Sequence, residues 1–178
     1  MNKYWKHFKT ITKHKAKVFE HCALVGIPMR GLLHDNSKYG ITEFCSSAKY
    51  FQGNRSPVDA EKEDRGYSLA WQHHKGHNPH HWEYWIDEVG TCKNVALKMP
   101  WKYALEMICD WLGAGQVYSK EAWTQHEPLA FYNKKKKYMR LHPDTQKFVE
   151  RCLKLIDEEG LDAFYEVGLD WAEEYENS

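Results

Sequence analysis

The stretch GLLHDNSKYG, residues 31 to 40, ends an apolar run with the pair His34 and Asp35, and Lys38 follows three residues after the aspartate. Imidazole nitrogens and carboxylate oxygens bind divalent transition metals, whereas an ammonium group binds anions and cannot ligate a cation. The pair alone does not establish a metal site, because Asp35 could equally accept hydrogen bonds at a helix end. The hypothesis of a metal centre therefore requires further ligands elsewhere in the chain.

The second candidate group is a histidine-rich segment, WQHHKGHNPHHWEYW. Its histidines are His73, His74, His77, His80 and His81. Each imidazole has two ring nitrogens that need partners, and the flanking tryptophans favour a packed segment over the alternative of a solvated histidine loop. If a helix ends near Gly76, His74 shares a face with Tyr67 and Trp71 and is a better inward ligand than His73. The break after that helix would let His80 or His81 return to the same site.

His14 is a third candidate because of its place in the first helical pattern. Trp5, Phe8 and Ile11 form an apolar stripe at helical spacing, and the stripe continues through His14 to Val18. The spacing predicts that His14 points inward and that His7 lies off this line. A core histidine bonded to a backbone carbonyl is the alternative interpretation.

Asp110 is the fourth candidate, since it lies in the apolar sequence ICDWL. A buried carboxylate is costly unless a cation or strong hydrogen bonds compensate its charge. Glu106 lies one helical turn earlier on the same face. A surface aspartate beside an Arg or Lys is the alternative for Asp110.

The elements that must position these residues are predicted to be helical, with no convincing alternating strand. Helices are expected at residues 5–25, 29–35, 42–51, 58–74, 100–118, 120–137 and 144–159, with a last one from Leu161. Residues 78–94 are expected to form a loop with short helical turns, and Ser119 is expected to cap the helix after it. The fold class is therefore all-α, as a single domain over residues 1–178.

Composition excludes several functional classes. The 25 basic and 25 acidic residues balance, so there is no strong nucleic-acid signal, and no apolar run is long enough to span a membrane. The five cysteines form no CxxC pair, which favours reduced thiols and a cytoplasmic location. The N-terminal residues contain no uninterrupted apolar segment of the kind found in secretory signals.

The order His14, His34–Asp35, a later histidine group and Asp110 resembles the HD-domain superfamily of metal-dependent phosphohydrolases. The stretch LLHDNSK matches its apolar-apolar-His-Asp-x-x-Lys form. More closely, GLLHDNSK, TEF, AW, NPHHWEYW and MPWKYALEMICDW resemble a small uncharacterised HD-like family of bacteria and their phages. The resemblance implies an HD-like helical bundle with a metal-site core at about residues 10–118, on which helices from residues 119–178 pack.

The resemblance also implies a ligand set and a mechanism. The implied metal ligands are His14, His34, Asp35, His74, His80, His81 and Asp110, although the choice among the histidines at 73–81 stays open. They would hold one or two divalent ions of Mn, Fe, Co, Ni or Zn, and Asp35 and a water would bridge two ions. The activated water would attack phosphorus while Lys38 contacts the phosphate. Glu43, Asn78 and Glu106 would orient the imidazoles or touch the substrate.

The expected function is hydrolysis of a small phosphorylated or nucleotide-like substrate by a phosphohydrolase or phosphodiesterase. Two alternatives remain from the sequence. One is a di-iron oxygenase of the inositol-oxygenase type, which uses a very similar ligand set, and the other is a metal-stabilised binding module without turnover. Association as a homodimer is left open.

Overall fold

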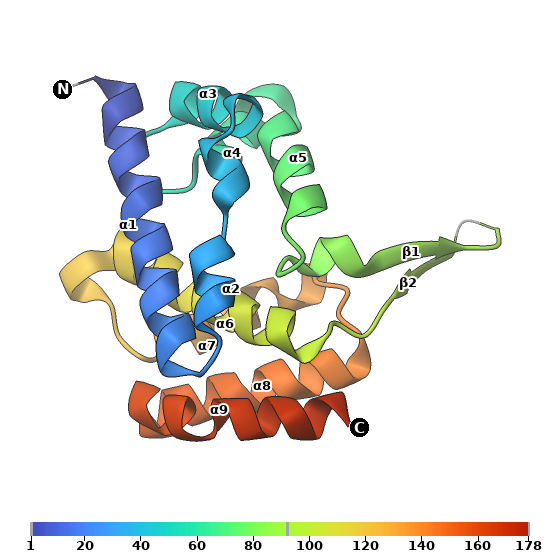
Figure 1. Cartoon of the computed structure of the whole chain (residues 1–178). Helices are drawn as coiled ribbons and strands as arrows, with labels where there is room; N and C mark the ends of the chain where they lie inside the picture. Colours follow the sequence, from blue (N-terminus) through green and yellow to red (C-terminus); the bar gives the residue numbers. More distant parts are fainter. Residues whose placement is uncertain (1, 92, 178) are drawn as a thin grey trace.

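The computed structural model describes residues 2–91 and 93–177, and its regular structure is almost entirely helical (Figure 1). The α-helices are α1 (Lys3–Leu24), α2 (Pro28–Leu33), α3 (Ile41–Tyr50), α4 (Pro57–Arg65), α5 (Leu69–His77), α6 (Trp101–Ser119), α7 (Glu127–Lys135), α8 (Pro143–Glu159) and α9 (Leu161–Glu176). The short 3-10 helices are η1 (Asn36–Tyr39), η2 (Trp82–Trp85), η3 (Lys120–Ala122) and η4 (Lys136–Tyr138). The predicted all-α class is confirmed.

One small hairpin departs from the predicted pattern. Strands β1 (Ile86–Val89) and β2 (Lys93–Ala96) pair antiparallel, with Ile86 opposite Ala96, and they project from the helical body in Figure 1. The prediction of short helical turns holds at η2, but the prediction of a loop after it is wrong. Two four-residue strands that carry mostly exposed side chains are too short to produce a clear alternation in the sequence.

The core forms where α6 packs between α1 and the C-terminal helices. The backbones of α1 and α6 approach closely at Gly113, where an added Cβ would lie 2.7 Å from Val18 Cγ2. The inward face of α6 carries Leu105, Ile108 and Leu112, all fully buried. Helices α8 and α9 lie side by side along this layer (Figure 1). Among the residues described, none of the helices has the length and apolar composition that a membrane crossing requires.

Two predicted helix boundaries are corrected. Residues 58–74 form two helices, because Gly66 adopts a φ of 79° that ends α4, and Ser68 then caps α5 by accepting the Trp71 N–H. Ser119 does not cap the helix after it. It is the last residue of α6, and its hydroxyl donates to Glu127, where α7 begins.

The predicted inward stripe of α1 is right at Ile11, His14 and Val18 but wrong at the start of the helix. Trp5 is 49% exposed, and its ring stacks on that of the partly exposed Phe8. His7 is instead buried between the rings of Phe44 and Phe51, and burial, with a smaller contribution from Lys38, lowers its pKa to about 4. The reason is tertiary, because the first turns of α1 pack against α3 rather than against α6.

Candidate metal centre

The predicted ligands come from four separate parts of the chain and meet in one place. His14 lies on α1, the pair His34–Asp35 follows α2, and Asp110 lies on α6. His74 is on α5, and the loop after α5 brings in His80 and His81. We call these seven residues the metal centre. All of them are buried or nearly so.

The turn that carries the His-Asp pair is held by contacts from α1. The Lys15 ammonium donates to the carbonyl oxygens of Leu32 and His34, at 2.7 and 2.8 Å, and so satisfies carbonyls that the end of α2 leaves without helical partners. Asp35 then adopts a left-handed conformation with a φ of 54°, which aspartate tolerates better than most residues. This turn directs the His34 and Asp35 side chains to the same point.

One ligand group gathers on the Oδ2 side of Asp35. Its members are His14, His34, Asp35 and Asp110. The Nε2 atom of His14 lies 3.0 Å from Asp110 Oδ1 and 3.5 Å from Asp35 Oδ2. The Nε2 atom of His34 lies 3.2 Å from Asp35 Oδ2 and 3.4 Å from Asp110 Oδ1. Two imidazoles and two carboxylates therefore face one another across a distance that a cation can span.

A second ligand group gathers on the Oδ1 side of the same aspartate. Its members are Asp35, His74, His80 and His81. Asp35 Oδ1 lies 3.2 Å from His74 Nε2 and 3.5 Å from His80 Nε2. Within the described chain, the buried Nε2 atoms of His74, His80 and His81 make no hydrogen bond. Asp35 is thus shared by two groups, and the second group presents three buried nitrogens without hydrogen-bond partners.

Carboxylates behind the imidazoles set their orientation. Glu106, fully buried, contacts Nδ1 of both His34 and His80, at 3.0 and 3.2 Å, and Glu43 contacts Nδ1 of His74 at 2.8 Å. A carboxylate on Nδ1 keeps the proton there and leaves the Nε2 lone pair directed at the centre. The Arg30 guanidinium donates to Glu106 at 2.7 Å and balances its charge.

Electrostatics favour ionised carboxylates in this centre. Burial alone would raise the pKa of Asp35, but His34, Lys38 and His74 hold it well below the usual value. Burial opposes ionisation of Asp110 as well, and hydrogen bonds from His14 and His34 outweigh it and lower its pKa. In both cases positive charge is what keeps the carboxylate ionised, and a bound cation would have the same effect.

The imidazoles of the centre differ in whether their surroundings lower or raise the pKa. Burial lowers the pKa of His80 and His81, and positive charge on neighbouring histidines lowers both further, so these rings stay neutral. The pKa values of His34 and His74 are raised despite burial, because Asp35 faces both rings, with Asp110 and Glu106 beside His34 and Glu43 beside His74, so a bound cation would displace a proton from each ring. Neutral imidazole and ionised carboxylate are the protonation states that metal binding requires. The donor set of nitrogen and carboxylate oxygen, with partnerless buried Nε2 atoms, therefore fits a divalent transition metal.

The other predicted residues lie around this centre. Lys38 Nζ is 2.5 Å from Asp35 Oδ2, and Asn78 donates to the His74 carbonyl at 2.8 Å, so Asn78 holds the end of α5. His73 faces away, paired with Glu43 and stacked on His77 at 4.0 Å between ring centroids. Sequence reasoning missed Arg30 and Lys15. Arg30 lies four residues before His34, but no local signal indicated either contact.

We predict that the five histidines of the segment differ in their contribution to metal binding. His74→Ala and His80→Ala should each lower metal affinity by on the order of 10- to 100-fold, because each removes a nitrogen that faces Asp35. His73→Ala and His77→Ala, which remove partly exposed rings, should leave affinity within about twofold. Metal titration of the four variants checks this. Equal losses in all four would mean that the segment chelates metal without a defined geometry.

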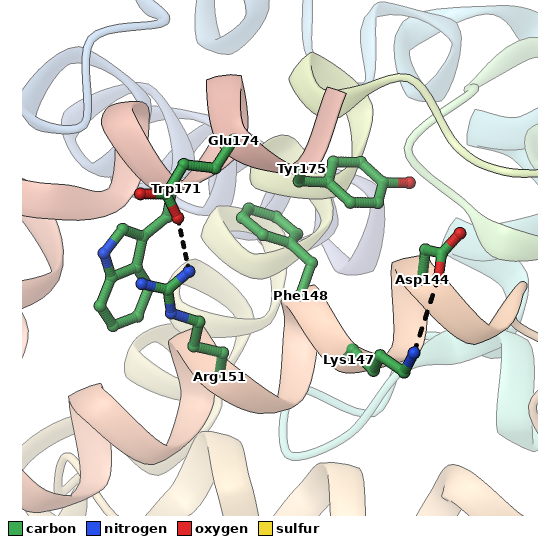
Figure 2. A pocket seen from close by; sticks show the side chains of 7 residues that line it. All are labelled: Asp144, Lys147, Phe148, Arg151, Trp171, Glu174 and Tyr175. Atoms are coloured by element: carbon green, nitrogen blue, oxygen red, sulfur yellow. Dashed lines mark hydrogen bonds and ion pairs between the residues drawn. The ribbon is translucent and has the colours of Figure 1, made fainter. Parts of the chain in front are cut away.

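Two surface hollows lie outside the centre. Figure 2 shows the smaller one, of about 310 Å³, between α8 and α9. Its charges are paired internally, Arg151 with Glu174 at 2.7 Å and Lys147 with Asp144 at 3.8 Å, and Arg151 lies over the Trp171 ring. The larger hollow, of about 790 Å³, lies between α1 and the end of α6, the two helices that carry His14 and Asp110.

The comparison with known families adds one finding. A model described as a family of unknown function, DUF5662, matches residues 3–155. The chain belongs to this family. The part that matches DUF5662 contains the whole metal centre, from His14 to Asp110. No curated protein and no solved structure matches the chain. Because the DUF5662 description names no reaction, the case for a metal centre rests on the geometry above.

Proposed function

We propose that this DUF5662 protein is a metal-dependent phosphohydrolase or phosphodiesterase of the HD type, acting on a small nucleotide-like phosphoester. The observation that carries the proposal is the position of Asp35, whose two carboxylate oxygens each face a separate group of imidazoles. A single bridging carboxylate between two ligand groups suits one or two divalent transition-metal ions, with Mn, Fe, Co, Ni and Zn all compatible with the donors. When bound, such ions supply an activated water and Lewis acidity toward a phosphoryl oxygen.

Lys38 favours an anionic substrate. Burial opposes its charge, but Asp35 and Asp110 raise its pKa above the usual value, so the side chain stays protonated. The Lys38 side chain is 31% exposed, whereas that of Asp35 is 3% exposed, so Lys38 reaches Asp35 from the solvent side and its ammonium is covered there. A cation in this place can bind a phosphoryl oxygen and stabilise negative charge as it develops. An oxygenase acting on a neutral substrate has less use for it.

We predict that the protein purified without chelator holds about one to two equivalents of transition metal and releases phosphate from at least one nucleotide-like phosphoester. Elemental analysis followed by a phosphate-release screen tests both parts, with oxygen consumption measured in parallel. Metal with oxygen consumption and no phosphate release would favour a di-iron oxygenase. Metal without any turnover would favour a binding module, and no metal after reconstitution would overturn the proposal.

A further inference from the structure

The larger hollow, which we call the α1–α6 cleft, is built by the same two helices as the metal centre. Lys13 and Lys17, on either side of His14 in α1, line it together with Gln116 and Tyr118 from α6. Its volume of about 790 Å³ is within the range of small-molecule sites. None of the seven residues of the metal centre lines the cleft, but Lys13 and Lys17 bracket His14 on α1, so the cleft adjoins the centre along this helix.

The cleft and the centre share the C-terminal half of α6. Asp110 and Gln116 are six residues apart on α6, which corresponds to a rise of about 9 Å along the helix. Tyr118 lies nearer. Burial raises the pKa of its hydroxyl, Lys38 lowers it and Asp110 raises it again, so Lys38 and Asp110 both act on this side chain. The rise of about 9 Å between Asp110 and Gln116 suits a substrate whose second anionic group lies several bonds from the phosphate that reacts.

Gln116 is oriented by a partly buried chain of hydrogen bonds. Its Oε1 accepts from His21 Nε2 at 3.1 Å, and His21 Nδ1 accepts from the Tyr165 hydroxyl at 2.6 Å. His21 is 2% exposed. Gln116 lines the cleft, and its amide NH₂ group is a donor available to a ligand there. Among the described residues, no acceptor bonds to this group.

The lysines of the cleft add further donors. Lys17 pairs with Glu20 at 2.7 Å, so this pair is neutral. The ammonium groups of Lys13 and Lys120 have no carboxylate partner in the described part of the chain, and Glu121 is the remaining acidic residue of the lining. Lys120 also has a φ of 52°, an unfavourable conformation for a residue with a side chain. The cleft thus carries a net positive charge and an oriented amide donor.

We propose that the α1–α6 cleft binds a second phosphate group, so that the preferred substrate carries two separated phosphates, as a nucleoside bisphosphate does. The inference rests on the proposed function for the first phosphate, which lies at the metal centre. Gln116 and Lys13 bind the second phosphate, which a monophosphate substrate lacks. Lys120 supplies positive charge at the rim of the cleft.

Calorimetric titration of the metal-loaded protein with adenosine 3′,5′-bisphosphate and adenosine 5′-monophosphate tests the proposal. The bisphosphate should bind at least roughly tenfold more tightly, the effect of one or two charge-assisted hydrogen bonds. Gln116→Glu and Lys13→Met should each remove most of this preference and leave monophosphate binding within about twofold. Lys147→Met, a change of an exposed lysine on α8, is the matched control and should alter neither affinity. Lys120→Gly should weaken bisphosphate binding while raising the melting temperature, because glycine relieves the backbone strain.

Equal affinities for the two ligands in the unmodified protein would overturn the proposal, and so would a preference that survives both Gln116→Glu and Lys13→Met. Lys13 is exposed, so its variant tests the cleft even if Gln116→Glu fails to fold. The two proposals fail in different ways. A protein that hydrolyses phosphoesters without preferring the bisphosphate lacks the second phosphate site, whereas one that prefers the bisphosphate without metal or turnover is not a phosphohydrolase.

Discussion

Asp35→Asn is expected to leave the protein folded and to remove most of its bound metal. Asparagine has the shape of aspartate and also tolerates the left-handed conformation that residue 35 adopts, so the turn after α2 is kept. The change removes the negative charge that both ligand groups share. Metal affinity should fall by more than the roughly 10- to 100-fold typical for loss of an outer hydrogen-bonding partner. Phosphoester turnover should fall by on the order of 1,000-fold or more.

The chain offers a matched control for this variant. Asp144 and Lys147 on α8 form an ion pair with the same three-residue spacing as Asp35 and Lys38, but both side chains are exposed (Figure 2). Asp144→Asn should change neither metal content nor turnover. Elemental analysis, circular dichroism and the phosphate-release assay compare the two variants. A folded Asp35→Asn protein with normal metal content would contradict the assignment of Asp35 as the bridging ligand.

Lys38→Met is expected to separate chemistry from metal binding. The ammonium is 2.5 Å from Asp35 Oδ2 and cannot ligate a cation, so its removal should leave metal content close to that of the unmodified protein. Turnover should fall by about one to three orders of magnitude, or about 1.4–4 kcal/mol of transition-state stabilisation. Methionine keeps much of the apolar stem and so limits the loss of packing. Lys38→Arg should restore activity only in part, because the guanidinium is planar and larger.

Lys147→Met on α8 is the control for loss of a lysine from an exposed ion pair and should keep full activity. Hydrolysis rates, measured beside metal content for all three variants, decide the role of Lys38. Undiminished turnover in Lys38→Met would place the lysine outside the reaction and would favour the oxygenase alternative. Loss of metal together with activity would instead mean that Lys38 mainly supports the position of Asp35.

The sequence predicted much of the helical fold because apolar periodicity and helix-ending glycines act between residues that are close in the chain. Apolar periodicity and the glycine at position 160 predicted a helix break there and a new helix from Leu161, and both are present, with Gly160 at a φ of 94°. The inward position of His14 follows from the same periodicity. The prediction failed at Trp5 and His7, because which face of the first turns of α1 is buried depends on where α3 lies. Periodicity defines a face of a helix but not the element that covers it.

The candidate site also has a part that the sequence predicted and a part that only the tertiary structure decided. Residue type and spacing pointed to His34, Asp35, His74 and Asp110, since imidazole and carboxylate are transition-metal ligands and a carboxylate on an apolar helix needs a compensating charge. Only the tertiary structure decided that Asp35 faces two groups at once. It also decided that His80 and His81 both return to the centre, and that Glu106 holds two imidazoles from separate elements while Arg30 balances its charge. These contacts join residues up to 76 positions apart, a separation at which sequence spacing carries no geometric information.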